Sequence, residues 1–253
     1  MIGLGLRTLV KKEVRRFMRV PGQTLLSPVV TTALYFVVFG WSLGGNLREV
    51  HGIPYARFIV PGLVALGVLT NAYLNTASSM FVMKLQGTIV DLLVSPLAYA
   101  EILVGMVAAA VWRGFIVGGI TWFVAGCFEG FELAHPFVAL GLLLLAAIGF
   151  ASVGLITAIW AKTFEQVNIV PTFIITPLTF LGGVFYSVDM LPPALRTFTL
   201  WNPIFYMVDG LRFGMLGVSD VSPVGGAVAL GLLAVGSTGA AYAVLRSGWR
   251  LRG

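Results

Sequence analysis

Long, uninterrupted runs of apolar residues are the feature of this sequence that most restricts its fold. Each residue advances a helix by about 1.5 Å, so a helix needs about 20 apolar residues to cross the hydrocarbon core of a bilayer. Six runs approach or exceed this length, and they are Leu25–Leu43, Phe58–Ala77, Ile102–Phe128, Phe137–Trp160, Ile169–Tyr186 and Val224–Leu245. Because the runs are continuous and do not alternate with polar residues, they predict membrane-spanning helices rather than strands.

The composition agrees with a membrane-embedded chain. Of the 253 residues, 58% are apolar and only 10% are charged, whereas about a quarter of the residues of a soluble domain are charged. A soluble fold of this length cannot bury so much apolar surface, so the surplus must face lipid. We therefore predict an all-α, polytopic membrane protein with a single transmembrane domain over residues 1–253 and six spans.

The basic residues predict the orientation of the chain. When the loops are assigned alternately to the two sides of the membrane, eleven Lys and Arg residues fall on one side and four on the other. The richer side holds Arg7, Lys11, Lys12, Arg15, Arg16, Arg19, Lys84, Lys162, Arg246, Arg250 and Arg252. The positive-inside rule then places both termini in the cytoplasm, which requires an even number of spans. The net charge of +6 is thus a topology signal, and we expect no nucleic-acid partner.

Residues 1–22 precede the first span and predict an interfacial helix. At about 100° per residue, the segment Leu4–Arg19 places apolar side chains on one face and basic side chains on the other. The predicted apolar face consists of Leu6, Val10, Val14 and Phe17. Such a helix lies in the headgroup layer. Two roles remain open for it, a lipid anchor that fixes orientation and a movable element beside a cytoplasmic partner.

The part of the chain before the last span is apolar but broken by prolines. Residues 23–187 hold the first five predicted spans, and Leu191–Leu216 is largely apolar with prolines at 192, 193 and 203. Prolines prevent one straight helix, so we expect short re-entrant helices on the outer side over residues 188–222, covered by neighbouring helices. The sixth span then occupies 223–246, and 247–253 form a cytoplasmic tail.

The sequence lacks the residues of the common catalytic and cofactor sites. No G-x-x-x-x-G-K-[ST] phosphate loop is present, so the chain cannot bind and hydrolyse a nucleotide by that route. Cys127 is the single cysteine, and His51 and His135 lie far apart, so neither a disulfide nor a cysteine-based metal cluster is expected. We predict that the chain is not an enzyme and binds no metal or cofactor. If the chain takes part in ATP-driven transport, a separate polypeptide must supply ATP hydrolysis.

Three charged residues of the apolar segments need an explanation. Arg113 falls well inside a predicted span, where an isolated charge is costly unless it faces protein, water or an anionic group. A cavity-facing site and a helix-pairing arginine are both open. Asp209 and Arg212 are three residues apart on one helical face, and for them a structural ion pair is the favoured interpretation.

The predicted cytoplasmic connection Lys84–Ala100 contains a candidate docking helix. Thr88 is placed to cap a short helix that ends before Pro96. Leu92 and Leu93 would be exposed on this helix unless a partner covers them, and an apolar projection flanked by polar residues suits a partner's groove. The alternative is a helix that lies flat on the bilayer.

Two blocks of sequence resemble the permease subunits of ABC-2 type transporters. The first is Gln86-Gly87-Thr88 followed by Leu92-Leu93-Val94-Ser95-Pro96 and Glu101-Ile102-Leu103-Val104-Gly105, which is similar to the coupling region of that family. The second runs from Pro177 to Tyr186 and continues through Leu191-Pro192, Asn202-Pro203, Asp209 and Leu211-Arg212. The dipeptide Lys12-Glu13 in the predicted interfacial helix also fits the pattern of that family. The chain looks most similar to the bacterial permeases of drug resistance, such as daunorubicin resistance, and of nodulation-factor export.

The resemblance implies a dimer of two such six-helix subunits in the bacterial inner membrane, sitting on two ABC ATPase subunits that bind ATP and Mg²⁺. It implies that Glu13, Gln86, Gly87, Thr88, Asp91, Leu92 and Leu93 contact the ATPase. Arg113, Phe180, Phe185 and Tyr186 are candidates for the translocation path. An amphipathic lipid-like or drug-like substrate is the favoured cargo, with polysaccharide or glycolipid export as the alternative. A channel or scaffold without an ATPase is the competing class of function.

Overall fold

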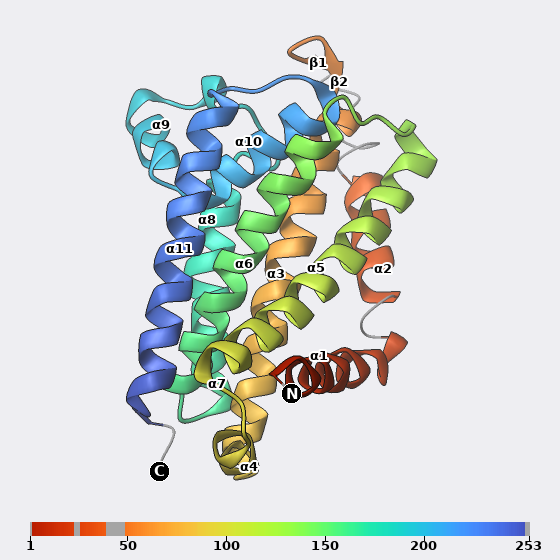
Figure 1. Cartoon of the computed structure of the whole chain (residues 1–253). Coiled ribbons are helices and arrows are strands. Elements are labelled where there is room, and N and C mark those ends of the chain that lie inside the picture. The colour runs from red at the N-terminus through yellow and green to blue at the C-terminus, as the bar shows by residue number, and fades with distance from the viewer. Residues whose placement is uncertain (1, 23–25, 39–48, 251–253) are drawn as a thin grey trace.

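The computed structural model describes residues 2–22, 26–38 and 49–250, and these form a helical bundle (Figure 1). Its long members are α3 (Tyr55–Leu85), α5 (Tyr99–Glu129), α6 (Pro136–Trp160) and α11 (Pro223–Ser247). Within the described ranges, these four helices are long and apolar enough to cross a membrane. They contain the predicted spans that begin at Phe58, Ile102, Phe137 and Val224, so the all-α membrane fold is confirmed.

The first and fifth predicted spans differ from the other four. The first lies partly outside the described residues, and its described part contains α2 (Ser27–Tyr35). The fifth is a helix in three sections, α7 (Phe164–Val170), the π-helical η3 (Pro171–Ile175) and α8 (Thr176–Phe180). A proline removes a backbone donor and disturbs the regular helix, which accounts for the π segment that begins at Pro171. The three sections run from Phe164 to Phe180, so this helix starts and ends earlier than the predicted span Ile169–Tyr186. The count of six spans stays a prediction.

The centre of the bundle is the contact between α3 and α6, where small residues allow a close approach. A Cβ atom added to Gly154 of α6 would collide with the carbonyl oxygen of Tyr73 and lie 2.5 Å from Thr76 Oγ1. The Thr76 hydroxyl donates across this contact to the carbonyl oxygen of Ala151, at 2.6 Å. Glycine is thus required at position 154 by packing, because a side chain would force the two helices apart.

We expect Gly154→Ala to destabilise the bundle by about 1–3 kcal/mol, the usual cost of overpacking a tight core. The matched control is Gly141→Ala in the same helix, where an added Cβ atom meets nothing within 4 Å. Thermal unfolding of the two variants in detergent micelles would measure the difference. Equal unfolding temperatures for both variants would contradict the close contact between α3 and α6.

The two ends of the bundle carry different elements (Figure 1). One end holds α1 (Ile2–Met18), α4 (Ile89–Val94) and the last turn of α11. The opposite end holds the strands β1 (Glu49–Val50) and β2 (Ile53–Pro54), which pair in antiparallel register, together with α9 (Pro193–Leu200) and α10 (Pro203–Leu216). The helix α1 and the last turn of α11 thus lie at the same end of the bundle, and the cytoplasmic orientation of that end stays a prediction.

The helix α1 is amphipathic as predicted, but its buried face is rotated. It packs along α5, and its buried side chains are Leu9, Glu13 and Phe17, whereas Val10 and Val14 are only half-buried. The prediction assigned only apolar residues to the buried face and did not include the carboxylate of Glu13. The buried face instead includes Glu13 because polar partners on α3 receive it, as described below.

The predicted outer helices are present as two short helices with different surroundings. Both begin at a proline, which fits the first turn of a helix because its missing N–H has no partner there. The 3-10 turn η4 (Val188–Met190) and α9 are largely exposed, while α10 packs against α3, α6 and α11. The Asn202 side chain caps α10 by accepting from the Ile204 N–H at 2.9 Å and donates to the Leu178 carbonyl oxygen at 2.6 Å.

Candidate functional site

A large groove separates α1 from α4 at the end of the bundle that carries both helices. Its volume is about 990 Å³. The α1 wall includes Thr8, Leu9 and Lys12, and the opposite wall includes Leu92 and Pro96. Both apolar and polar residues line it, and it opens to the surface. A groove of this kind can receive a helix or side chains of another protein.

The helix α4 presents two faces that the sequence prediction did not separate. Ile89, Leu92 and Leu93 face inward, since Ile89 is buried and both leucines are half-buried against the core. Val90 and Val94 are 55% and 79% exposed. Leu92 and Leu93 are thus partly covered by the chain's own core and are not fully exposed as expected, although Leu92 still lines the groove. The i, i+3, i+4 spacing of positions 89, 92 and 93 already indicates a shared inward face, with Val90 and Val94 one turn apart on the other side.

The turn between α3 and α4 is built by Gln86, Gly87 and Thr88. Gly87 has a φ of +74°, a left-handed conformation that favours glycine. The predicted Thr88 cap is absent, because Thr88 has helical dihedral angles and its hydroxyl donates back to the Met83 carbonyl oxygen at 3.4 Å. The helix ends before Pro96 as predicted. Gln86, Thr88 and Asp91 are exposed and line the groove.

Glu13 connects α1 to α3 through a buried polar cluster. Its side chain is 1% exposed, and its Oε2 atom accepts from Ser79 Oγ at 2.6 Å and from Arg16 Nε at 3.0 Å. Arg16 Nη2 in turn donates to the carbonyl oxygen and to Oδ1 of Asn75, at 2.9 and 3.0 Å. In this structure Glu13 is therefore inaccessible to another protein. A role in coupling has to act through the connection of α1 to α3.

We expect Glu13→Ala to loosen α1 and to lower stability by about 2 kcal/mol. The substitution removes the acceptor of Ser79 and Arg16, and a lost hydrogen bond to a charged group costs about 1.5–3 kcal/mol. Thermal unfolding together with limited proteolysis at α1 would show both effects. Glu165→Ala is the control, because that carboxylate is exposed at the start of α7. Protease resistance of α1 in the Glu13 variant would contradict the assignment.

The structure does not bring the four candidate path residues together. Arg113 lies on α5 beside α1, with its guanidinium carbon 5.8 Å from the centre of the Phe17 ring. Phe180 and Phe185 lie at the end of α8 and after it, with ring centres 6.3 Å apart, and the half-buried Tyr186 follows. Arg113 therefore belongs to the contact of α1 with α5, whereas the aromatic residues border the outer helices.

The buried charges at the end of the bundle that carries α9 and α10, here named the outer end after the predicted topology, form one connected cluster. Arg212 Nη1 lies 3.7 Å from Asp209 Oδ1 and 3.7 Å from Asp220 Oδ2, and Arg212 Nη2 donates to the Gly183 carbonyl oxygen at 2.6 Å. The Asp209 carboxylate accepts the N–H groups of Asp220 and Val221, at 2.7 and 3.1 Å. The predicted pair of Asp209 and Arg212 is thus part of a larger link between α10, the turn after α8 and the loop before α11.

Among the described residues, one group of side chains has the atom types of a metal site. The ligand atoms of His51, Asp189 and Asp220 lie within 4.8 Å of one another. The Asp220 oxygens already accept from Ser187 Oγ at 2.9 Å and from the Val188 N–H at 3.0 Å, and Asp189 pairs with Arg196 at 3.2 Å. These hydrogen bonds make the group a polar contact between the β1–β2 turn and the outer helices.

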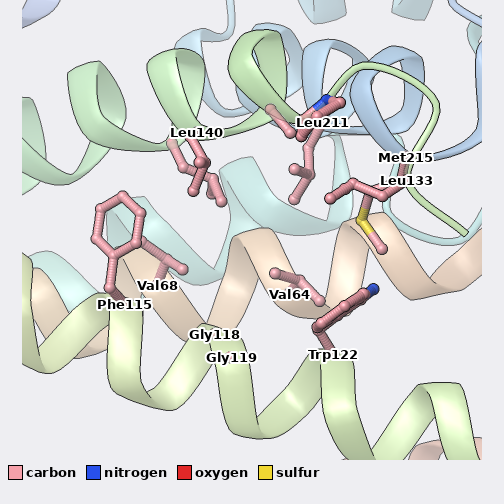
Figure 2. Close-up of a pocket in the computed structure, with 13 residues that line it drawn as sticks. Val64, Val68, Phe115, Gly118, Gly119, Trp122, Leu133, Leu140, Leu211 and Met215 are labelled. Carbon is pink, nitrogen blue, oxygen red and sulfur yellow. The ribbon is translucent and has the colours of Figure 1, made fainter. Parts of the chain in front are cut away.

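A small apolar pocket lies between the long helices near the outer end (Figure 2). Its volume is about 180 Å³. Val64 and Val68 of α3 form one wall, and Phe115 and Trp122 of α5 project from another, with Leu211 of α10 above (Figure 2). No charged side chain lines it. The pocket can hold only an apolar group of modest size.

Comparison with known proteins identifies the family. The sequence profile of the ABC-2 type transporter family matches residues 5–216, which is most of the chain. The chain belongs to the ABC-2 type transporter family. The inner membrane transport permease YadH of Escherichia coli K12 is 45% identical over 219 residues, which cover 86% of this chain and 85% of YadH. Nodulation protein J of Rhizobium leguminosarum bv. trifolii is 29% identical over 210 residues, covering 82% and 80%.

This ABC-2 chain is therefore a membrane transport permease, and the resemblance drawn from the sequence is confirmed. The matched region runs from α1 to the end of α10 and includes the groove between α1 and α4, the Glu13 cluster and the outer charge cluster. Its similarity to an inner membrane permease, together with its apolar helices, supports an inner-membrane, multi-pass protein.

Proposed function

We propose that this permease is the transmembrane subunit of an ATP-driven exporter and that a separate ABC ATPase docks at the groove between α1 and α4. The exposed apolar pair Val90 and Val94 on α4, a helix that also forms one wall of this groove, is the observation that carries the proposal. Two exposed valines one turn apart on a short helix suit burial in the groove of a partner. In this arrangement α4 and both termini lie on the cytoplasmic side.

The contacts of α1 and α4 support transmission of movement into the bundle. Gly105 of α5 is in close contact with Leu9 of α1, since an added Cβ atom would lie 2.8 Å from Leu9 Cδ2. Glu13 and Arg16 join α1 to α3, and α4 follows α3 after the short turn at Gly87. A displacement of α4 and α1 by the ATPase would therefore act on α3 and α5 together.

We propose further that two copies of the chain pair and that the substrate is amphipathic, either lipid-like or drug-like. Phe173 of η3 and Phe180 of α8 are 73% and 60% exposed, and aromatic side chains at such density suit an interface between helices. The apolar pocket of Figure 2 supports an apolar portion of the cargo, because a sugar chain needs polar partners that its walls lack.

The decisive experiment is reconstitution of the permease into liposomes with and without the ABC ATPase encoded beside it. Vesicle export of a fluorescent amphipathic probe should require the ATPase, ATP and Mg²⁺, and the two proteins should co-purify. Transport or ion conduction by the permease alone would contradict the proposal and would favour a self-contained channel. Absence of stable binding to any ABC ATPase would favour a scaffold.

A further inference from the structure

A second pocket at the same end of the bundle carries three cations. It lies on the other side of α4 from the groove, has a volume of about 400 Å³, and is here named the basic pocket. Lys84, Lys162 and Arg250 line it, and none of its lining residues carries a carboxylate. They come from the end of α3, the loop after α6 and the segment after α11, so the fold gathers them from three distant parts of the sequence.

Two of the three cations, Lys84 and Arg250, donate to carbonyl groups at the end of α6, and the three have no acidic partner among the described residues. Lys84 Nζ donates to the carbonyl oxygens of Ile159 and Ala161, at 2.6 and 2.8 Å, and Arg250 Nη1 donates to that of Trp160 at 2.7 Å. These oxygens end α6, where the helix dipole contributes only about half a negative charge. Across the described ranges, no carboxylate lies within ion-pair distance of these cations. The pocket therefore keeps a positive charge that an anion would neutralise.

The remaining wall of the basic pocket is apolar. Phe81, Ile89 and Val90 line it, and Ile89 is buried while Val90 is exposed. A soluble anion gains nothing from such a wall. A phospholipid places a phosphodiester group beside its acyl chains, so one molecule of this class satisfies both the cations and the apolar wall.

Aromatic residues indicate that the pocket lies at the level of the membrane boundary. Trp160 ends α6 and Trp249 follows α11, and both are partly exposed. The Arg250 guanidinium carbon lies 4.8 Å from the centre of the Trp249 ring. Tryptophan is enriched at the interface between lipid and water, which is the level at which headgroups are found.

We propose that the basic pocket binds the phosphodiester headgroup of an anionic phospholipid from the leaflet on the α4 side. The lipid would neutralise Lys84, Lys162 and Arg250 and would tie the ends of α3, α6 and α11 together beside α4. This inference does not depend on the identity of the substrate, and Val90 is the one residue of the basic pocket that it shares with the proposed ATPase contact.

The test compares lipid retention by two double variants of the full chain with equal loss of charge. Lys162→Gln with Arg250→Gln removes two cations of the pocket but leaves Lys84, which caps α6. Arg7→Gln with Lys11→Gln removes two exposed cations of α1. Native mass spectrometry after titration with phosphatidylglycerol or phosphatidylcholine counts the bound lipids. The preference is the affinity for phosphatidylglycerol divided by that for phosphatidylcholine. We expect this ratio to fall about tenfold in the Lys162/Arg250 variant and to stay unchanged in the Arg7/Lys11 variant.

Four outcomes would overturn the proposal. An unchanged preference in the Lys162/Arg250 variant would exclude the pocket as the site, and an equal loss in both variants would indicate unspecific attraction. Displacement of phosphatidylglycerol by inorganic phosphate at equal concentration would show that the site takes a free anion. Near-native thermal unfolding of both variants excludes misfolding as the cause of the expected loss. If the Lys162/Arg250 variant retains the lipid but no longer binds the ATPase, the pocket serves a protein partner instead.

Discussion

Replacement of Arg212 by methionine is expected to lower the stability of this permease by about 3–5 kcal/mol, the range found when one partner of a buried ion pair is removed. Arg212 is 1% exposed and faces both Asp209 and Asp220. Without it, two carboxylates remain in a buried site with no compensating charge. The Gly183 carbonyl oxygen also loses its donor, and the contact of the guanidinium with the Phe58 ring, 4.0 Å from its centre, disappears.

Thermal unfolding in detergent would measure this loss, and Arg196→Met is the matched control. Arg196 pairs with Asp189 on the same end of the bundle, but both side chains are more than half exposed, and such pairs contribute at most about 1 kcal/mol. Adding Asp209→Asn and Asp220→Asn to the Arg212 variant should restore part of the stability, because the uncompensated charges are then removed. If the triple variant is as unstable as the Arg212 variant, the loss of stability comes from packing and not from the uncompensated charges.

The fold could be predicted from the sequence wherever one signal dominates. Apolar runs of sufficient length identified α3, α5, α6 and α11. In lipid, a single segment can form all of its backbone hydrogen bonds internally only as a helix. The two short outer helices followed from prolines at 193 and 203. The fifth span was predicted with shifted ends because hydropathy excluded the polar residues of α7, which are Glu165, Gln166 and Asn168, and included the apolar residues that follow α8.

The candidate site was harder to predict, because it depends on which face of a short helix is covered by other parts of the chain. The sequence prediction selected Leu92 and Leu93 as exposed, whereas the packing of α4 on the core leaves Val90 and Val94 in that position. In α1 the family resemblance implied that Glu13 contacts the ATPase, yet Ser79 and Asn75 on α3 complete a buried cluster around it. Both cases need contacts that are distant in sequence.

The basic pocket shows the same difficulty for the charges. Lys84, Lys162 and Arg250 were all assigned to the richly basic side, so their common compartment followed from the sequence. Their convergence on one pocket did not, because it requires the ends of α3, α6 and α11 to meet. A positive-inside count thus identifies the side of the membrane but cannot distinguish scattered cations from a binding site.

The second large effect is expected at the docking helix. Val90→Asp combined with Val94→Asp should weaken binding of the ABC ATPase by about 100-fold or more and abolish ATP-driven transport. Burying a valine side chain contributes about 1.5 kcal/mol or more, and the two new carboxylates would have to lose their water at the interface. Because both valines point away from the bundle, the unfolding temperature of the permease alone should hardly change. Surface plasmon resonance with the purified ATPase would measure the affinity.

The structure supplies two comparisons that make this result specific to α4. Val90→Thr with Val94→Thr keeps the shape of the side chains without adding charge, so most of the ATPase affinity should remain. Leu92→Asp with Leu93→Asp places charges on the face that packs against the core, so these changes should lower the unfolding temperature first and affect binding only through that loss. If the Val90/Val94 aspartate variant binds the ATPase normally while the Leu92/Leu93 variant is stable and fails to bind, the inward and outward faces of α4 are reversed in the complex and Val90 and Val94 do not dock.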